Sequence, residues 1–505
     1  MTKQISGTQL AIILGLTTAM ASAVGCQGAD SDPTASPGAD ATPTPSDEAS
    51  PTPTFEQDSD KVLSIDIASN PGCDLSAVLT WTTSEPASSW VEFGEGGLTH
   101  RIGSDTLTTD HEVVVLGMYA ETSFDIRAVS VTESGDTLVS RTQDYTTGDL
   151  PYSWMETEVD VLIADSERGW TLYNAAIDNM DTPVVLQMLN EDGKTIWYYA
   201  HEGDSGRLDA QVSWVDGEVL FGPAVAQGET IFRTDLTGEI VWEGPVQEGD
   251  RLDEDGTFHH VTESLSNGDI LTVRLERETV SGTSVSSDTL IQYDANSDEV
   301  WSWAAIEHTD VLPLDVDSLD QNGDWLHINS AAVDLENDAV YFSSLKLKKV
   351  VKVNRTTGEV EWMLGDGGDF EADPSVDEPW FTSLHAMEYL GDSRFILYDN
   401  GDASRRSSRA MIYQLDENTM EATVEWTFSG DGDTFYNNVG GDADLLNSGN
   451  VLVVGGSGMS GSTDTRLMEV NENGDLVWQV WPYQGSTTVS VFQADRIEAL
   501  AELID

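Results

Sequence analysis

Cysteine is almost absent from this chain of 505 residues, which contains only Cys26 and Cys73. Because Cys26 lies in a segment that we expect to be processed, one thiol remains for the folded part, and one thiol cannot form an internal disulfide. The fold must therefore be held by packing, and metal sites built from several cysteines are excluded. Cys73 is most simply a small buried hydrophobic residue.

Basic residues are also scarce: 23 Lys and Arg stand against 90 Asp and Glu, which gives a formal net charge of -67. Contacts to phosphate groups need Lys and Arg, so nucleic acids and anionic membrane surfaces are excluded as partners. Hydrophobic residues make up 39% of the chain, and 15 Trp are present, which is ample for buried cores. At this length we expect more than one domain.

The apolar run near the N-terminus, residues 10–23, is too short to span a bilayer. Lys3 precedes it, and Ala23-Val24-Gly25-Cys26 ends it in a sequence that resembles the lipobox of bacterial lipoproteins. The pattern predicts a signal peptide over residues 1–25 and lipidation of Cys26. An ordinary secretory signal cleaved nearby is the alternative.

The residues after Cys26 predict a tether and a location. Gln27 rather than Asp follows the cysteine, which resembles the outer-membrane sorting pattern, so we expect a lipid-anchored protein of the cell envelope at the outer membrane. Residues 26–60 are dominated by Asp, Pro, Ser, Thr and Ala, a composition that cannot bury enough apolar surface to fold. The lipid anchor is the only membrane contact that we expect.

Residues 61–149 show short alternating runs that predict β-strands, over residues 76–83, 89–94, 112–116 and 123–131. Their order resembles a fibronectin type III-like β-sandwich. Since nothing in this segment gathers titratable groups, we expect it to be an accessory or spacer domain.

A Trp recurs six times after a strand-like run and an acidic or Gly-containing turn, as in Asp235-Leu-Thr-Gly-Glu-Ile-Val-Trp242. The intervals between successive Trp residues are 45, 59, 61, 64 and 52 positions, enough for about four short strands each. An all-β fold with a six-bladed β-propeller over residues 150–505 is predicted, and each blade would place one strand around the central axis. The six residues are Trp197, Trp242, Trp301, Trp362, Trp426 and Trp478.

Three His residues stand at matching places in consecutive units. His260, His327 and His385 precede the next repeated Trp by 41, 35 and 41 positions, in a chain with only eight His. Matched positions on inner strands point at one axial funnel, where three imidazoles could bind a metal, polarise an anion or supply a nucleophile with supporting donors. His259 is an alternative to His260, because adjacent strand residues point to opposite faces.

The segment Asp324-Trp-Leu-His-Ile-Asn-Ser330, together with His259-His260, His385-Ala-Met387 and Tyr398-Asp-Asn-Gly401, resembles the bacterial arylsulfate sulfotransferases. The resemblance covers residues 150–500. It implies transfer of a sulfuryl group from an aryl sulfate ester to a phenol, without an adenosine phosphosulfate donor and with no cofactor or metal. Small-molecule aryl sulfates and phenols would be the partners.

The same resemblance implies a ping-pong route in which His385 is the nucleophile that becomes sulfohistidine. His260 and His327 would steady the sulfate oxygens and handle the phenol proton. Imidazole is a competent nucleophile when its other nitrogen is held. With a covalent intermediate, the donor and acceptor phenols also need not occupy one in-line geometry at the same time.

One position departs from the family pattern, because Leu345 stands where family members carry an Arg after paired serines. Lys346 follows it, but a strand would point Lys346 to the opposite face, so we regard Arg405 or Arg406 as better candidates for the missing charge. Asn329, Tyr436 and His259 are further supporting candidates. Six basic residues lie in these two segments and would draw an anionic ester into an acidic protein, or simply face solvent. They are Lys346, Lys348, Lys349, Arg405, Arg406 and Arg409.

A second function stays open at the level of sequence. The Asp-x-Thr-Gly-Glu-x-x-Trp repeat is also similar to the repeats of quinone-cofactor propellers and of outer-membrane assembly scaffolds. With Leu345 in place of the Arg, the chain could be a non-catalytic cell-surface binding or scaffold propeller, or a degenerate family member. Ligand binding without turnover would distinguish it from an enzyme.

Overall fold

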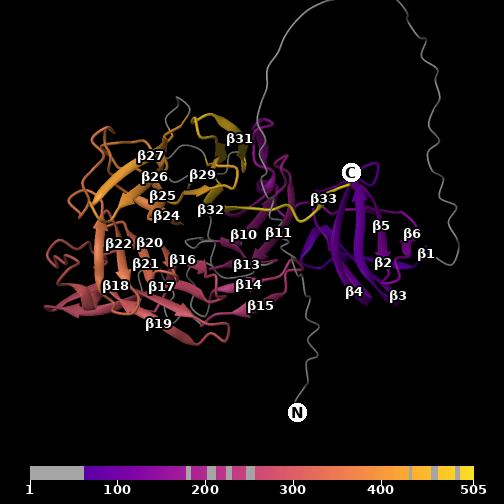
Figure 1. The fold of residues 1–505 in the computed structure, drawn as a ribbon, viewed down its shortest axis with the longest axis horizontal. Coiled ribbons are helices and arrows are strands. Elements are labelled where there is room, and N and C mark those ends of the chain that lie inside the picture. Colours follow the sequence, from indigo (N-terminus) through magenta and orange to yellow (C-terminus); the bar gives the residue numbers. More distant parts are fainter. Residues whose placement is uncertain are drawn as a thin grey trace, which may run out of the picture.

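The computed structural model describes residues 62–177, 184–201, 212–215, 217–222, 230–245, 256–430, 435–456, 465–483 and 489–504. The expected signal peptide, the lipidation site at Cys26 and the tether over residues 26–60 lie outside the described residues. Figure 1 shows two bodies, a smaller group of indigo strands beside a ring of sheets.

The N-terminal strands form one hydrogen-bonded sheet of eight strands in the order β1-β6-β5-β3-β4-β33, with β2 on β3 and β7 on β5. Trp81 is buried in its core and stacks on His111, with ring centroids 4.9 Å apart. The likeness to a fibronectin type III sandwich stays a prediction. The strands are β1 (Val62–Leu63), β2 (Ile65–Asn70), β3 (Cys73–Gly94), β4 (His100–Val115), β5 (Ser123–Val131), β6 (Thr137–Ser140), β7 (Gln143–Thr146) and β33 (Glu502–Leu503).

Six further sheets form the ring, which confirms the six-bladed β-propeller. We number the blades along the chain and give each from its innermost strand outward. Blade 1 has β32 (Val489–Ile497), β9 (Trp170–Ile177), β10 (Val184–Leu189) and β11 (Thr195–His201); blade 2 has β12 (Val212–Val215), β13 (Glu218–Phe221), β14 (Phe232–Thr234) and β15 (Ile240–Glu243); blade 3 has β16 (Phe258–Ser264), β17 (Ile270–Val280), β18 (Thr283–Tyr293) and β19 (Glu299–Ala304).

The other three blades repeat this meander. Blade 4 has β20 (Ile328–Asp334), β21 (Ala339–Ser344), β22 (Lys349–Asn354) and β23 (Val360–Leu364); blade 5 has β24 (Leu384–Gly391), β25 (Arg394–Asp399), β26 (Arg409–Asp416) and β27 (Glu421–Phe428); blade 6 has β28 (Asp442–Leu445), β29 (Val451–Gly455), β30 (Arg466–Val470), β31 (Leu476–Trp481) and, at its outer edge, β8 (Glu158–Leu162). The innermost strands β12, β16, β20, β24, β28 and β32 contact one another in turn around the axis.

Both ends of the propeller segment close the ring. The C-terminal strand β32 pairs antiparallel with β9 as the innermost strand of blade 1, and the early strand β8 pairs with β31 at the edge of blade 6. Edge strands that would otherwise expose unpaired backbone groups are thereby covered. Beyond β32 the chain returns to the N-terminal sheet, where β33 pairs with β4.

The six repeated Trp residues all lie on the outer strands of the blades, and four of them connect neighbouring blades. In each case the indole Nε1 donates to a backbone carbonyl in the turn before the outer strand of the next blade. The pairs are Trp197 with Leu236 (3.0 Å), Trp242 with Ala295 (3.2 Å), Trp301 with Arg355 (3.0 Å) and Trp478 with Glu191 (3.2 Å). The repeat therefore encodes contacts between blades as well as a strand in each blade.

Replacing Trp478 by Phe tests this contact where the ring closes. The Phe ring keeps most of the buried apolar surface but leaves the carbonyl of Glu191 without its donor, which costs about 1 kcal/mol. Trp154 is the matched control, because it is also buried but its Nε1 has no partner in the described part of the chain. We expect Trp478→Phe to lower the free energy of urea unfolding more than Trp154→Phe, and equal losses would contradict a role for the hydrogen bond.

Candidate functional site

The innermost strands of blades 3, 4 and 5 share an irregularity at or next to a His. The pairing register shifts between Phe258 and Thr262 in β16, between Ile328 and Ser330 next to His327, and between Leu384 and Ala386 around His385. His260 and His327 have φ angles of 56° and 52°, in the left-handed region that a residue other than Gly rarely adopts. Such bulges re-aim side chains at functional sites.

The bulges bring four imidazoles together at the axis. The ring centroid of His260 lies 5.1 Å from that of His259, 5.0 Å from His327 and 6.4 Å from His385. The ring of Phe492 on β32 closes the group at 5.7 Å from His260 and 6.3 Å from His385. The predicted convergence of three His is therefore present, and it includes His259 as well as His260.

The proton of His385 can be assigned from its partner Asn400. The side-chain nitrogen of Asn400 donates to the carbonyls of Asn437 and Gly440, each at 2.7 Å, so its Oδ1 must face Nδ1 of His385, also at 2.7 Å. That oxygen can only accept, so Nδ1 of His385 carries the hydrogen and Nε2 holds a lone pair. Burial, aided by the charge of His327, lowers the pKa of His385 to about 4, which keeps the lone pair available.

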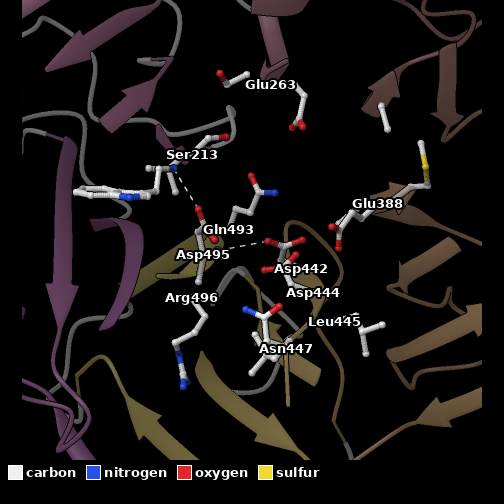
Figure 2. A pocket seen from close by; sticks show the side chains of 18 of the residues that line it. Ser213, Glu263, Glu388, Asp442, Asp444, Leu445, Asn447, Gln493, Asp495 and Arg496 are labelled. Carbon is white, nitrogen blue, oxygen red and sulfur yellow. Dashed lines mark hydrogen bonds between the residues drawn. The ribbon is translucent and has the colours of Figure 1, made fainter. Parts of the chain in front are cut away.

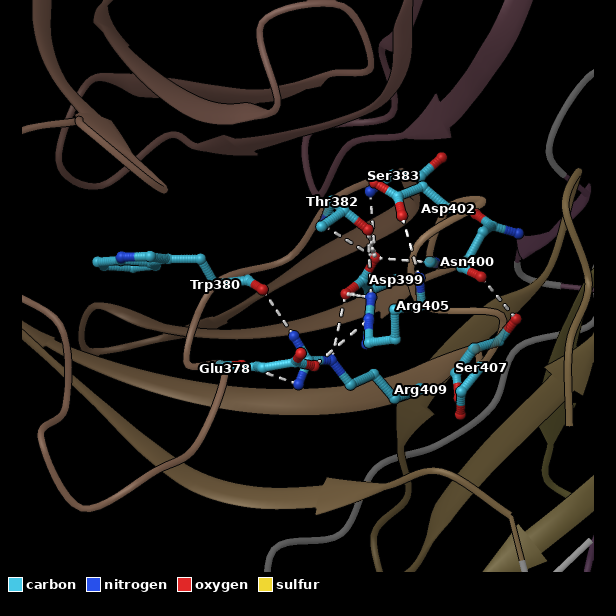
Figure 3. Close-up of polar contacts among 12 residues, drawn as sticks. Glu378, Trp380, Thr382, Ser383, Asp399, Asn400, Asp402, Arg405, Ser407 and Arg409 are labelled. Carbon is cyan, nitrogen blue, oxygen red and sulfur yellow. Dashed lines mark hydrogen bonds and ion pairs between the residues drawn. The ribbon is translucent and has the colours of Figure 1, made fainter. Parts of the chain in front are cut away.

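A network around Asp399 holds Asn400 in place (Figure 3). The fully buried carboxylate accepts hydrogen bonds from the backbone amides of Thr382 and Ser383, each at 3.1 Å. The guanidinium groups of Arg405 and Arg409 pair with its other oxygen, Arg409 at 3.2 Å. Asn400 is the next residue along the chain, so these contacts also orient His385.

His327 is hydrogen-bonded to a carboxylate that favours its protonated form. Its Nδ1 lies 2.8 Å from Oδ2 of Asp324, which Lys346 also contacts at 3.1 Å. Burial by itself lowers the pKa of His327, but the hydrogen bond to Asp324 and the charges of Asp324 and Asp288 outweigh it and raise the pKa above its ordinary value. His327 therefore keeps a proton to higher pH than His260 and His385 do.

His259 lies behind His260 and connects it to a buried carboxylate on β18. Nδ1 of His259 is 2.9 Å from Nδ1 of His260, and Nε2 of His259 is 3.2 Å from Oδ1 of Asp288. The other oxygen of Asp288 accepts the backbone N–H of Ile328 at 2.8 Å. Burial, together with the charges of His327, His259 and His385, lowers the pKa of His260 well below its ordinary value.

The basic residues expected to replace the missing Arg are engaged elsewhere. Arg405 binds Asp399 rather than facing the imidazoles, so it does not restore the charge there. Lys346 lies in a turn over residues 345–348, not on a strand, so alternation of faces does not apply to it. Its ammonium pairs with Asp320 at 2.7 Å and with Asp324, and so reaches His327 only through Asp324.

Of the remaining candidates, Asn329 contacts the residue before His385, and Arg406 and Tyr436 contact each other. Asn329 is 1% exposed, and its side-chain nitrogen donates to the carbonyl of Leu384 at 2.6 Å. Its Oδ1 is buried and has no partner in the described residues, so it remains an acceptor. Arg406 is exposed and lies over the ring of Tyr436, 5.1 Å from the centroid.

A chamber of about 310 Å³ follows the His cluster along the same inner strands. Figure 2 shows the carboxylates of Glu263, Glu388, Asp442 and Asp495 around it, and Asp444 lines it too. Burial, followed by mutual repulsion, raises the pKa of Glu263 to about 8, and burial is also the main cause of the raised pKa values of the other four. Within the described ranges, no group of three or more His, Cys, Asp or Glu side chains is arranged to hold a metal ion.

The acidic chamber makes stability depend on pH. Glu263 has a folded-state pKa of about 8 and an ordinary value of 4.5, so the folded state binds the extra proton between these values. Its contribution to stability is complete below pH 4.5 and is lost as the pH rises to about 8. Glu263→Gln should therefore raise the free energy of unfolding at the upper end of this window by on the order of 1 kcal/mol and leave it unchanged at the lower end.

Urea denaturation at the two ends of the window measures this difference. Glu278→Gln is the matched control, since it removes the same charge from an exposed position on β17. An equal gain in both variants would show that net charge, rather than the chamber, sets the pH dependence.

Two positioning residues were not predicted from the sequence. Asp288 stands in a run of buried residues in β18, and a charged residue in such a run was a usable signal. Asn400 lies in the quoted segment Tyr398–Gly401, but its contact with His385 spans 15 positions and no local pattern indicates it. Asp324, which holds His327, also lies in a quoted segment.

The fold is a six-bladed β-propeller with a cluster of imidazoles at its axis. A family model described as arylsulfotransferase (ASST) matches residues 160–488. The chain belongs to the arylsulfotransferase family. Membership supports arylsulfate sulfotransferase activity in the broad sense.

Comparison with known proteins adds little beyond the family. No curated protein matches. Among solved structures, the chain is similar to the β-propeller domain of Cps50 (Swd1) from Myceliophteria thermophila, with 11% identity, 64% of this chain and 88% of that chain covered, and a TM-score of 0.35. A Synechocystis apocarotenoid oxygenase mutant has 10% identity, with 68% and 96% covered and a TM-score of 0.32. No helix in the described part of the chain is long and apolar enough to cross a membrane.

Proposed function

We propose that this protein transfers a sulfuryl group from an aryl sulfate ester to a phenolic acceptor through a sulfohistidine at His385. The observation that carries the proposal is the hydrogen bond from Nδ1 of His385 to Asn400, which leaves Nε2 with a lone pair beside the other imidazoles. An imidazole whose second nitrogen is held in this way is a competent nucleophile. A covalent intermediate lets donor and acceptor phenols use the same subsite in turn.

In the first half-reaction, Nε2 of His385 attacks the sulfur of the ester. The N–S bond forms, the S–O bond breaks, and the electron pair leaves with the phenol oxygen. Negative charge in this loose transition state is spread over the sulfuryl oxygens, so a nearby cation contributes most to catalysis. The acceptor phenol reverses these steps in the second half-reaction and returns His385 to its neutral form.

His327 supplies the cation that Leu345 does not. Its imidazolium lies in the same cluster, with Nδ1 bound to Asp324 and Nε2 left for a sulfuryl oxygen. Asp324 maintains that charge, and Lys346 holds Asp324. The clamp that an Arg provides elsewhere in the family is here a His whose protonation depends on a carboxylate.

Removal of the nucleophile tests the proposal directly. We expect His385→Ala to reduce release of 4-nitrophenol from 4-nitrophenyl sulfate by at least about 1000-fold. In the wild type, quenching without an acceptor should leave one SO3 group on the peptide that contains His385, as mass spectrometry can show. His100→Ala, in the N-terminal sheet, is the matched control and should keep full activity.

Two other outcomes of these measurements would contradict the proposed sulfuryl transfer. Undiminished turnover in His385→Ala would remove His385 from the mechanism. A wild type that binds aryl sulfates without releasing phenol, with binding that survives His385→Ala, would instead identify a non-catalytic binding propeller.

The charge on His327 predicts a pH dependence of activity. His327 must be protonated, so activity falls as the pH rises through its raised pKa. Asp324→Asn removes the carboxylate that raises this pKa and should move the alkaline limb of the pH–rate profile to lower pH. Asp320→Asn removes a carboxylate that binds Lys346 but not His327, and its limb should stay at the wild-type position. Identical profiles for the two variants would contradict this role of Asp324.

A further inference from the structure

His259 contacts both His260 and Asp288 but has no part in the sulfuryl transfer described above. It is 6% exposed and Asp288 is 2% exposed, so neither side chain exchanges freely with solvent. Asp288 cannot swing away, because its Oδ2 also accepts the backbone N–H of Ile328 from the neighbouring blade. The three side chains therefore form a fixed row from the carboxylate to the axis.

The contact between the two Nδ1 atoms at 2.9 Å contains one hydrogen, and that hydrogen has two possible owners. If the hydrogen is bonded to Nδ1 of His260, then Nε2 of His260 has a lone pair. His259 is neutral in this arrangement and donates from its Nε2 to Asp288. If His259 owns it, His259 is protonated on both nitrogens beside Asp288, and Nε2 of His260 carries a hydrogen. The two arrangements differ by one proton, which enters or leaves at Nε2 of His260.

In this row the proton enters and leaves at His260, but the positive charge lies on His259. A charge on His260 itself would be buried among His259, His327 and His385, with Asp324 and Lys346 beyond His327. On His259 the same charge faces the carboxylate of Asp288, 3.2 Å away. No described residue hydrogen-bonds to Nε2 of His260, and in the relay this atom is the one that meets the substrate.

We propose that Asp288, His259 and His260 form a proton relay that gives the phenol proton to the leaving group in the first half-reaction and recovers it from the acceptor in the second. The inference rests on the proposed sulfuryl transfer. His260 is the catalytic residue of the row, and His259 and Asp288 are positioning residues that store the charge.

The proton balance closes over the cycle. As the S–O bond of the donor breaks, the phenol oxygen takes the proton from Nε2 of His260, and the Nδ1 proton of His259 moves to Nδ1 of His260. In the second half-reaction the acceptor oxygen bonds to sulfur, the N–S bond returns its electron pair to His385, and the acceptor proton enters at Nε2 of His260. The Nδ1 proton then returns to His259.

The acidity of the leaving phenol tests the relay, because an acidic phenol departs without a proton and a weakly acidic one needs it. Single-turnover phenol release isolates the first half-reaction and is measured for phenyl sulfate and for 4-nitrophenyl sulfate. We expect Asp288→Asn to slow phenol release from phenyl sulfate about 100-fold, and release from 4-nitrophenyl sulfate less than about threefold. Asp334→Asn, the matched control, removes another buried carboxylate, from the end of β20, and should not change the ratio of the two rates.

A second variant guards against misfolding of Asp288→Asn. His259→Gln keeps a polar side chain between Asp288 and His260 but cannot hold an extra proton, so it should show the same selective loss with phenyl sulfate. Equal slowing of both esters, or no slowing of either, in the variant that folds would overturn the relay. A wild type that releases no phenol from either ester would overturn the sulfuryl transfer itself, and the relay with it.

Discussion

The antiparallel pairing of β32 with β9 closes the ring of blades, and the axial site depends on this closure. Inner strands of a propeller meet only when every blade has a neighbour on both sides. β32 also places Phe492 against His260 and His385, and Asp495 in the acidic chamber. The strand that completes the fold is thus also a wall of the site.

Electrostatics divide the axis into two regions along the same strands. Imidazoles lie at the upstream ends of β16 and β24 and on the residue before β20, and the downstream parts of these strands face a chamber lined by carboxylates. Within the imidazole region, charge is assigned by the carboxylates behind each ring: Asp324 holds a proton on His327, whereas His385 has the neutral amide of Asn400. In a protein with a net charge of -67, the carboxylate of Asp324 favours a positive charge on the imidazole of His327.

Periodic features of the chain were predictable, and single long-range contacts were not. The Trp repeat indicated six blades because each copy lies on an outer strand and repeats at blade length. The matched distances from those Trp residues located His260, His327 and His385 on inner strands. Arg405 or Arg406 was expected to replace the missing cation; in the structure Arg405 pairs with Asp399, a contact that no periodicity along the chain indicates. Lys346 was misplaced on a strand because its segment has the composition of one, whereas it forms a turn.

The sequence by itself determined the all-β class, the number of blades and which imidazoles share the axis, since these follow from spacing along the chain. Only the tertiary structure decided which groups face the nitrogens of each imidazole. The partners Asn400 of His385 and Asp288 of His259 lie 15 and 29 positions away along the chain. Their approach is set by bulges and by packing between blades, which no local pattern of residues encodes.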